Sequence, residues 1–524
     1  MRFTARILLL LASLASFAYA QNNIPQIQHV IVVIQENRTP DNLFQADSTL
    51  ISNGADIATQ GSCHGTPITL TGAPLAINFD PDHSHYPSWE QTWDHNQMDG
   101  ACDTTVHWPA GTDPYPLHPQ YTFAQNTIWD QQHSYGVLDP YFQLAGWYGY
   151  SNYMFQTNMG PSFPAHQFLL SGTSAPIYSP QQYFDNFAAE NPPDIYQTGC
   201  VAPQGQVVEQ MPPSNPYNTE IPGYNAGFPC YEHPTMTDLL DAASIKWRYY
   251  NYENLSESPY GAHIWNAPDA IHHLCYPLTH NNQQCNGTHF NDGSIVTTGP
   301  EQILADIQSC NLQPVSWVIP DGRWSDHPGD PQGDAGPSWV AAIYNSVGGY
   351  DLQNNCGYWN NTVILVTWDD WGGFYDHVNP DPIQTGYSNH TGGQYVYGFR
   401  VPLLVISKFA KPGYISGTCQ SGKCQNYKQP FIHDFGSILR FSENVFGLGQ
   451  IDSQNQYAYA DAMAPDATPT CPQLCPYALS DFFDFTHQNN FQPILHPKYN
   501  ATWFLQYYSN GNQPEDPDND ADEE

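Results

Sequence analysis

Two pairs of oxygen-bearing side chains each follow a run of apolar residues. Glu36 and Asn37 come after "HVIVVIQ", and Asp369 and Asp370 come after "TVILVTW". Three carboxylates and one amide oxygen form a set of hard ligands that suits a divalent metal ion. Each acid could instead cap a helix or lie in solvent, because acids are common turn residues. Two such pairs at strand ends favour a metal site.

A candidate nucleophile lies in the segment "NMGPSFPAHQFLLSG". Ser162 stands between two prolines, directly before the helix-like stretch "AHQFLLS". A hydroxyl in this place faces the positive end of a helix dipole and free N–H groups, which favours binding and attacking an anionic phosphoryl group. On local pattern alone, a simple N-cap serine is the more frequent explanation of such a residue.

Histidines in polar loops complete the set of candidates. They could donate to phosphoryl oxygens or act as general acid to a leaving alkoxide. The chain has 21 histidines, so most are expected to have surface or hydrogen-bonding roles. The candidates singled out by their loop context are His83, His273, His327 and His377.

The elements that must position these residues form an α/β pattern. Short β-branched runs predict buried strands of a mainly parallel sheet at 30–34, 315–319, 363–367 and 403–406. Helix-like segments lie at 236–246, 337–347 and 435–446. We therefore expect a mainly parallel central sheet flanked by helices, with the polar residues at its ligand-binding carboxyl edge.

The two ends of the chain have distinct compositions. The segment "MRFTARILLLLASLASFAYA" has the basic start, apolar run and small-x-small end of a secretory signal peptide. We expect cleavage near Ala20 and a secreted, extracellular protein, with a periplasmic location also open. We expect one domain over 21–512 with a disulfide-tied insertion around 200–260, and a disordered acidic tail over 513–524. No later segment holds the ~20 apolar residues of a transmembrane helix.

Cysteine and charge content restrict the compartment and the partners. Twelve cysteines in an exported chain predict disulfides, with three close pairs as plausible partners: Cys275/Cys285, Cys419/Cys424 and Cys471/Cys475. The last pair could also ligate zinc. Acidic residues outnumber basic ones by 50 to 13, which argues against nucleic acid or an anionic membrane as a partner of the bulk surface. The oligomeric state is not indicated.

Several motifs together carry a family resemblance. The chain resembles the phosphoesterase family that contains bacterial and plant non-specific phospholipases C and a secreted bacterial acid phosphatase, within the alkaline-phosphatase-like superfamily. The resemblance spans roughly residues 29 to 450 in the family's order. The matching segments are "HVIVVIQENRTPDNLF", "WDHNQMDG", "NMGPSFPAHQFLLSG", "SWVIPDGRWSDHPGD", "VTWDDWGGFYDHVNP" and "RVPLLVISKFAKPGYI".

This resemblance implies a role for each matching position. Ser162 matches the nucleophile, and the implied metal ligands are Glu36, Asn37, Ser162, Asp369 and Asp370. The histidines that match those lining the phosphate site are His83, His273 and His327. One divalent metal ion is implied, and an oxygen-rich site would suit Ca, Mg, Mn or Zn.

The chain departs from the family's pattern in two places. Many members have Pro-Asn-Arg after the nucleophile, whereas this chain has Pro164-Ala165-His166 and would lose an Asn or Arg contact near the phosphate. Many members have Asp-Glu-Asn-Gly-Gly, whereas this chain has Asp369-Asp370-Trp371-Gly372-Gly373. The shorter second acid would alter metal distance or preference.

The expected function is hydrolysis of phosphate esters through a serine nucleophile with a divalent metal, in the manner of a phospholipase C acting on phospholipid. Two alternatives remain open, an acid phosphatase acting on small phosphomonoesters and a non-catalytic secreted binding protein on the same fold. The intact ligand set argues against the binding protein. Asn37-Arg38-Thr39 is a glycosylation sequon, but an Asn37 that binds metal should carry no glycan.

Overall fold

The computed structural model describes residues 24–109, 116–175, 187–193, 198–211, 226–252, 263–276, 284–380, 397–420, 423–424, 431–452, 459–463 and 478–512. The predicted signal peptide, the acidic tail and the pair Cys471/Cys475 lie outside these residues, as do the side chains of Cys419 and Cys424. The predictions made for them are untested.

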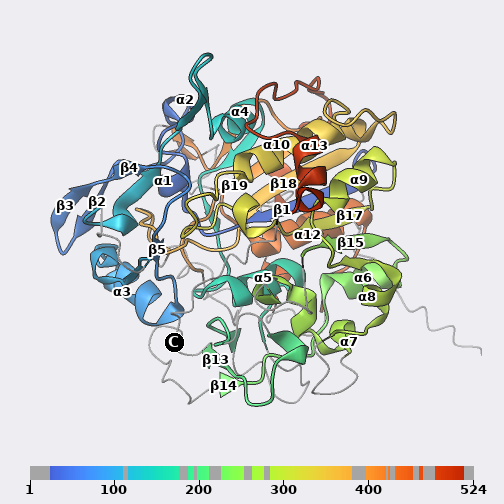
Figure 1. The fold of residues 1–524 in the computed structure, drawn as a ribbon, viewed down its shortest axis with the longest axis horizontal. Helices are drawn as coiled ribbons and strands as arrows, with labels where there is room; N and C mark the ends of the chain where they lie inside the picture. The colour runs from blue at the N-terminus through green and yellow to red at the C-terminus, as the bar shows by residue number, and fades with distance from the viewer. Residues whose placement is uncertain are drawn as a thin grey trace, which may run out of the picture.

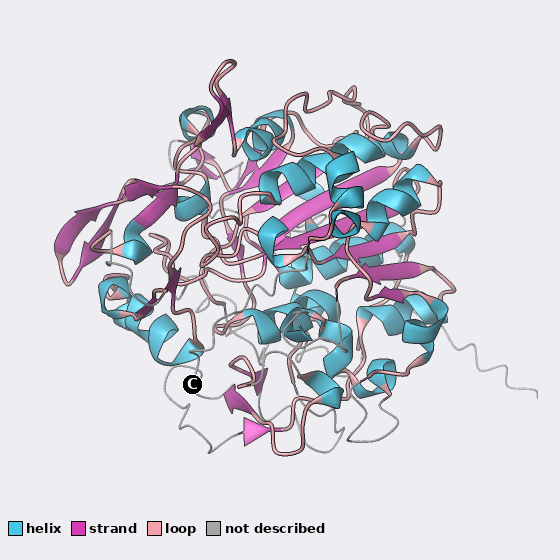
Figure 2. Cartoon of the chain, in the orientation of Figure 1, coloured by secondary structure: helices cyan, strands magenta, loops and turns pink. Residues whose placement is uncertain are grey.

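An eight-stranded sheet runs through the centre of the protein (Figures 1 and 2). In spatial order its strands are β16 (Ile295–Val296), β15 (Trp247–Tyr250), β17 (Val315–Val318), β1 (His29–Gln35), β18 (Thr362–Trp368), β19 (Leu403–Ser407), β10 (Gly149–Ser151) and β20 (Tyr414–Ser416). Only β19 runs antiparallel to its neighbours in this sheet. The prediction of a mainly parallel sheet is confirmed.

The middle of the sheet is buried on both faces. Every residue of β18 is buried, and in β1 only His29 is partly exposed. Continuous apolar runs of this kind are typical of parallel strands covered by helices on both sides. The parallel register places Gln35 opposite Trp368, so β1 and β18 end side by side.

Helices cover the sheet (Figure 1). Helix α10 (Gly336–Val347) packs against α4 (Asp139–Trp147), α9 (Gln302–Gln308), α13 (Ala501–Gln506) and β18. Helix α5 (Ser162–Ser171) packs against α12 (Phe435–Phe446). The Trp317 indole N–H donates to the Leu169 carbonyl at 3.3 Å and thereby links β17 to α5. The helices predicted at 337–347 and 435–446 are confirmed.

Shorter elements surround this core (Figure 2). The additional helices are α1 (Pro40–Leu43), α2 (Ser48–Ser52), α3 (Glu90–Trp93), α6 (Met236–Ala242), α7 (His272–Cys275) and α8 (Thr288–Asp292). The additional strands are β2 (Gln60–Cys63), β3 (Thr66–Thr69), β4 (Thr71–Ala73), β5 (Asp80–Pro81), β6 (Val106–His107), β7 (Thr122–Ala124), β8 (Ile128–Asp130), β9 (Tyr135–Gly136), β11 (Met154–Phe155), β12 (Phe187–Ala188), β13 (Val208–Met211), β14 (Ala226–Gly227), β21 (Cys419–Gln420), β22 (Lys423–Cys424) and β23 (His433–Asp434).

The interval 200–260 contains more of the core than its composition suggested. The helix predicted at 236–246 is present but ends at Ala242. Strand β15 lies in the same interval, yet it pairs with β17 in the central sheet. The disulfide Cys200–Cys230 ties this region internally, as expected.

Four disulfides connect the described residues: Cys63–Cys102, Cys200–Cys230, Cys275–Cys285 and Cys310–Cys356. The predicted pair Cys275/Cys285 is confirmed. Within the described part of the chain, no helix is both long and apolar enough to cross a bilayer. Multiple disulfides suit an oxidising compartment.

Candidate metal and phosphoester site

The ends of β1 and β18 bring four predicted ligands together. Backbone hydrogen bonds from Asp369 N–H to the Gln35 carbonyl (2.9 Å) and from Arg38 N–H to the Asp370 carbonyl (3.1 Å) continue the strand pairing beyond the ladder. The Asn37 N–H then donates to Asp369 Oδ1 at 3.1 Å. Two dipeptides 332 residues apart therefore form one buried cluster of carboxylate and amide groups.

A tight turn follows Asp370 and fits against the Asn37 loop. Asn37 has a φ of 61° and Gly372 has the same value, so both residues are in the left-handed region. A Cβ on Gly372 would lie 2.3 Å from the Asn37 carbonyl oxygen, closer than any real contact. Gly372 is therefore required for the two ligand-bearing loops to approach each other.

Ser162 is the first residue of α5, and its side chain points to the carboxylates. The N-cap is Pro161, so the simple N-cap alternative for Ser162 is wrong. The Ser162 hydroxyl lies 3.3 Å from Glu36 Oε2 and 3.4 Å from Asp370 Oδ2, and the residue is fully buried. The start of a ten-residue helix thus presents a hydroxyl to two acids.

Two of the three predicted site histidines meet at the Asn37 side chain. Asn37 Nδ2 lies 3.2 Å from His83 Nε2 and 3.0 Å from His327 Nε2. The Nδ1 atoms of these rings lie 3.1 Å and 2.6 Å from the backbone carbonyls of Pro81 and Pro328. This pattern favours the tautomer in which Nδ1–H donates to a carbonyl and Nε2 accepts from the amide. The amide oxygen Oδ1 then faces away from both rings.

The third predicted histidine, His273, lies on α7 among different partners. Its Nδ1 is 2.8 Å from Glu232 and its Nε2 is 3.3 Å from Asp238. Burial alone would lower the pKa of His273, but hydrogen bonds with Asp238 and Glu232 outweigh it and raise the pKa. Its described contacts do not join it to the Asn37 cluster, so a role in the reaction remains a prediction.

His166 belongs to the site, although sequence reasoning noted it only as a departure from the family's pattern. Its Nε2 lies 3.0 Å from Glu36 Oε1 and 3.7 Å from Asp369 Oδ2. Its ring stacks on Trp265 with 6.2 Å between centroids. Burial lowers its pKa to about 4, against an opposing effect of Asp369. The spacing from Ser162 was the available signal, because residues four apart share a helix face.

Comparison with known proteins decides the family. The sequence profile described as "Phosphoesterase family" matches residues 27–449, which is most of the chain. The chain belongs to the phosphoesterase family. The family resemblance inferred from the motifs is therefore confirmed, and the candidate site lies within the matched region.

Relatives within the family are distant. A non-hemolytic phospholipase C of Pseudomonas aeruginosa is 27% identical over 287 residues, which cover 50% of this chain but only 34% of that enzyme. Phospholipase C A of Mycobacterium tuberculosis is 24% identical over 478 residues, covering 85% of this chain and 77% of the relative. A crystal structure from Vibrio parahaemolyticus, described as a protein in the alkaline phosphatase superfamily, is 10% identical over 60% of this chain and 62% of that chain. The TM-score of the structural match is 0.30.

The charge balance of the candidate site fits a metal ion. Burial and the negative charge of Asp369 hold the pKa of the Asp370 carboxyl well above its ordinary value. No lysine or arginine is among the described contacts of Asp369 or Asp370. Asn37 Oδ1 and Asp369 Oδ2 are buried and accept no hydrogen bond from the described residues. Oxygen atoms that are buried and unused in this way are suitable cation ligands.

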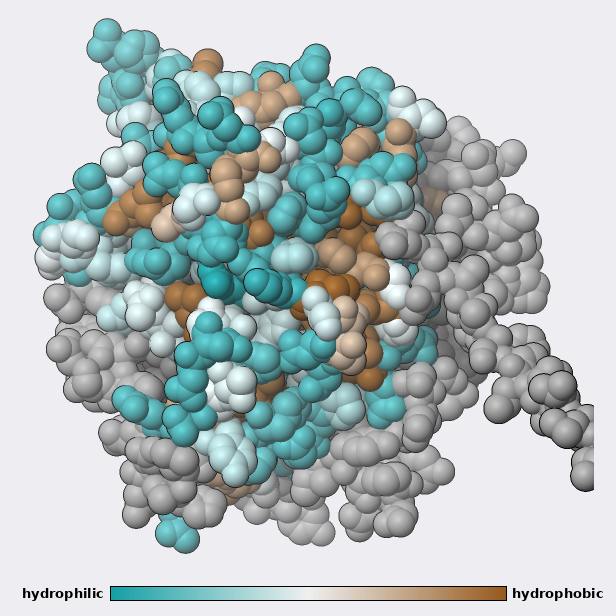
Figure 3. Space-filling model, turned by 90° about the vertical axis from the view of Figure 1, so that its right-hand side faces the viewer, coloured by the Kyte–Doolittle hydropathy of each residue, from teal (hydrophilic) through white to brown (hydrophobic). Residues whose placement is uncertain are grey.

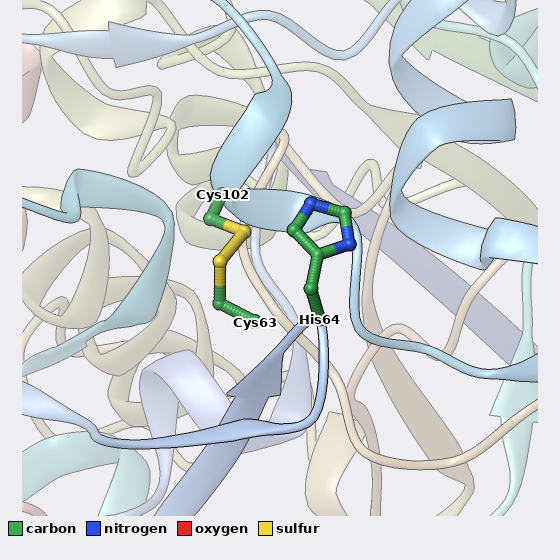
Figure 4. Close-up of side chains that lie close together, drawn as sticks. All are labelled: Cys63, His64 and Cys102. Carbon is green, nitrogen blue, oxygen red and sulfur yellow. A yellow bond between two sulfur atoms is a disulfide. The ribbon is translucent and has the colours of Figure 1, made fainter.

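Three other groups among the described residues resemble metal sites by composition. One of them, His64, Asp94 and Asp99, is exposed or partly exposed, and the other two have a different explanation. Cys63, His64 and Cys102 lie close together, yet the two sulfur atoms form a disulfide and hold no lone thiolate (Figure 4). Asp41, Asp376 and His377 also cluster, but the buried Arg400 pairs with both acids. His377 was a sequence-based candidate, and the structure places it in this second cluster instead.

Proposed function

We propose that this chain is a secreted, metal-dependent phosphoesterase that acts like a phospholipase C, with Ser162 as its nucleophile. The position of the Ser162 hydroxyl between Glu36 and Asp370 carries the proposal. The signal-like N-terminus and the disulfides support secretion. Membership of a family whose relatives include phospholipases C supports the ester substrate.

The residues that would hold the metal are Glu36, Asn37, Asp369 and Asp370, with Ser162 beside them. A divalent ion bound there would stabilise negative charge on the phosphoryl oxygens and on the serine oxygen. Glu36 and Asp370 are also the nearest described acceptors for the proton that Ser162 gives up. Burial of all five side chains keeps bulk water from competing with these contacts.

The reaction would proceed in two steps. The Ser162 oxygen bonds to phosphorus while the bond from phosphorus to the leaving oxygen breaks, and that oxygen takes a proton from an imidazole. Water then attacks the phosphoserine and gives a proton back to that imidazole, while the bond from phosphorus to Oγ breaks and Oγ regains its proton from Glu36 or Asp370. His327 is our first candidate for the acid because it contacts Asn37 within the ligand cluster, and it would enter this step protonated on both nitrogens; His273 is the second candidate.

The substrate is proposed to be a phospholipid with a zwitterionic head group. The formal net charge of −37 would repel anionic lipid and anionic monoesters. The face in Figure 3 is largely hydrophilic, with apolar patches separated by polar residues. A phospholipase C would cleave the glycerol-side ester and release the phosphorylated head group.

The test compares substrates on purified full-length protein. We expect hydrolysis of phosphatidylcholine in mixed micelles, weaker hydrolysis of p-nitrophenyl phosphate, and loss of both activities after prolonged chelation. Restored activity after return of a divalent metal would confirm the dependence. Faster hydrolysis of the monoester would identify an acid phosphatase, activity on neither substrate would favour a binding protein, and full activity after chelation would exclude the metal.

The nucleophile is tested by Ser162→Ala. Removing it should lower kcat at least ~10³-fold, because the covalent step is lost while binding remains. Ser171→Ala is a matched control, since Ser171 is the last residue of the same helix and its buried hydroxyl has no hydrogen-bond partner among the described residues. Folding of both variants is checked by circular dichroism. Full activity in Ser162→Ala would rule the mechanism out.

A further inference from the structure

His166 occupies a position between two of the proposed metal ligands. Helix α5 places Ser162 and His166 one turn apart, and both side chains contact Glu36. The serine hydroxyl lies 3.3 Å from Oε2, and the imidazole Nε2 lies 3.0 Å from Oε1. The Glu36 carboxylate is therefore shared between a hydroxyl and an imidazole on one helix face.

The atoms of this group have the spacing of ligands around one ion. His166 Nε2 and one carboxylate oxygen each from Glu36 and Asp369 all lie within 4.8 Å of one another. The nitrogen is 3.0 Å from the Glu36 oxygen and 3.7 Å from the Asp369 oxygen. Ligand atoms about 2.0–2.2 Å from a zinc-sized ion are themselves about 3.0–3.6 Å apart. The three atoms thus need little rearrangement to bind a common metal.

The surroundings of His166 fix its ring in this orientation. It is 1% exposed and stacks on Trp265 at an interplanar angle of 15°. Its other nitrogen, Nδ1, has no hydrogen-bond partner among the described residues. The polar contacts described for this ring are thus confined to the Glu36 and Asp369 carboxylates.

We propose that His166 is a nitrogen ligand of the metal, so that this chain holds a mixed nitrogen and oxygen site selective for a transition metal such as Zn²⁺. This inference rests on the metal dependence in the proposed function and deepens it. Imidazole nitrogen suits Zn²⁺, Fe²⁺ and Ni²⁺, whereas an all-oxygen set suits Mg²⁺ and Ca²⁺. An arginine, which the pattern of many family members places here, supplies no ligand atom. The departure at Pro164-Ala165-His166 therefore changes which metals bind.

The test measures metal binding directly, without substrate. Full-length protein is stripped with chelator, titrated by calorimetry with Zn²⁺, Mg²⁺ and Ca²⁺, and loaded with one equivalent of Zn²⁺ for X-ray absorption spectroscopy. We expect imidazole scattering around zinc in the wild type. His166→Gln should lose that scattering and bind Zn²⁺ at least ~10-fold more weakly. Its affinities for Mg²⁺ and Ca²⁺ should change much less.

A second buried histidine provides the matched control. His233 is as buried as His166, and its described hydrogen bond is to the Pro234 carbonyl rather than to a carboxylate. His233→Gln should keep both the zinc affinity and the imidazole scattering. If His166→Gln does not fold, His166→Asn and the spectrum of the wild type still decide the question.

The outcomes separate this inference from the proposed function. An oxygen-only shell around zinc in the wild type, or imidazole scattering that persists in His166→Gln, would overturn the assignment of His166. If that wild type still hydrolyses the ester in a chelator-sensitive manner, the proposed function stands. The opposite outcome is imidazole scattering that disappears in His166→Gln, combined with a wild type that hydrolyses no ester. It would support His166 as a metal ligand and contradict the proposed phosphoesterase activity.

Discussion

Two buried groups of acids arise from the same two segments of the chain, yet their charges are balanced in different ways. We call Glu36, His166, Asp369 and Asp370 the site cluster, and Asp41, Asp376, His377 and Arg400 the arginine cluster. Both are built where the segment after β1 meets the segment after β18. The acids of the arginine cluster pair with cationic side chains of the chain itself. In the site cluster, no lysine or arginine is described in contact with Asp369 or Asp370.

In the arginine cluster every described acid has a cationic partner. The Arg400 guanidinium donates to both oxygens of Asp376, at 2.8 Å and 2.9 Å, and to Asp41 at 3.3 Å. His377 Nδ1 lies 2.7 Å from Asp41. Backbone carbonyls of Asp56 and Asn152 accept the remaining guanidinium hydrogens. This is the arrangement a buried ion pair needs in order to be tolerated.

In the site cluster the acids face a hydroxyl, imidazoles and each other. The raised pKa of Asp370 is the electrostatic consequence, caused by burial and by Asp369. The chain thus pairs acids with its own cations a few residues away, whereas Asp369 Oδ2 in the site cluster accepts no hydrogen bond from the described residues. This difference supports the proposal that a metal ion completes the site cluster, whereas Arg400 connects the two loops in the arginine cluster.

The largest expected effect comes from breaking the arginine cluster. Arg400→Met would leave Asp376 and Asp41 buried without their cation, which should lower the free energy of unfolding by about 3–5 kcal/mol. Urea unfolding followed by tryptophan fluorescence measures the change. Lys498→Met removes a partly exposed pair with Asp334 and should cost at most ~1 kcal/mol. Equal losses in the two variants would contradict the structural role of the cluster.

A smaller, pH-dependent effect is expected at His377. Burial would lower its pKa, but hydrogen bonds with Asp41 and Asp56 outweigh it and raise the pKa from 6.5 to about 10. A raised folded pKa contributes stability that is fully present below the unfolded pKa and is lost as the pH rises through the folded pKa. His377→Gln should therefore cost about 2 kcal/mol near pH 6, and progressively less as the pH rises from 6.5 towards 10.

Unfolding free energies of the wild type and His377→Gln, measured at several pH values, give this difference directly. His64→Gln serves as the control, since His64 pairs with Asp103 at the surface. We expect little effect of that change at any pH. A cost for His377→Gln that grows with pH would show that the hydrogen bonds to Asp41 and Asp56 do not stabilise the charged imidazole.

An Asp→Asn substitution should change the free energy of unfolding in opposite directions in the two clusters. In metal-free protein, Asp370→Asn removes a carboxyl that repels Asp369 and should raise the free energy of unfolding by about 1 kcal/mol. Asp376→Asn removes an acceptor from Arg400 and should lower it. Adding the divalent metal should reverse the first result, because Asp370 is then a ligand. Unfolding with and without chelator tests both, and destabilisation by Asp370→Asn in metal-free protein would contradict the comparison.

The ends of β1 and β18 could be predicted because the signal was local. Each strand is a continuous apolar run followed at once by acids or an amide, and parallel pairing places such ends together. Ser162 was likewise visible from its place before a helix. Strand β15 was missed because Trp247–Tyr250 is short and lies in a Pro-, Tyr- and Asn-rich interval that hides its pattern.

The balance of charge in each cluster could not be predicted. Arg400 donates to Asp41, which lies 359 positions away in the sequence, and no local sequence pattern predicts such a pair. From the sequence, His166 stood out only as a departure from the family's pattern that would remove an Asn or Arg contact near the phosphate. Its spacing from Ser162 specified a shared helix face, but only the fold shows that this face meets Glu36. Ring contacts with the distant Trp265 were equally hidden.

The smallest expected effect is the absence of a modification at the edge of the site cluster. Asn37 has the sequon pattern, but its side chain is fully buried and its Nδ2 donates to two imidazoles, which leaves no room for a sugar. Asn360 and Asn500 also begin sequons and are exposed, so they serve as internal controls. After expression in a eukaryotic host, peptide mass spectrometry should find glycan at one or both controls and none at Asn37. A glycan on Asn37 in active enzyme would remove this residue from the proposed ligand set and leave the carboxylates, the serine hydroxyl and the imidazole as the remaining proposed ligands.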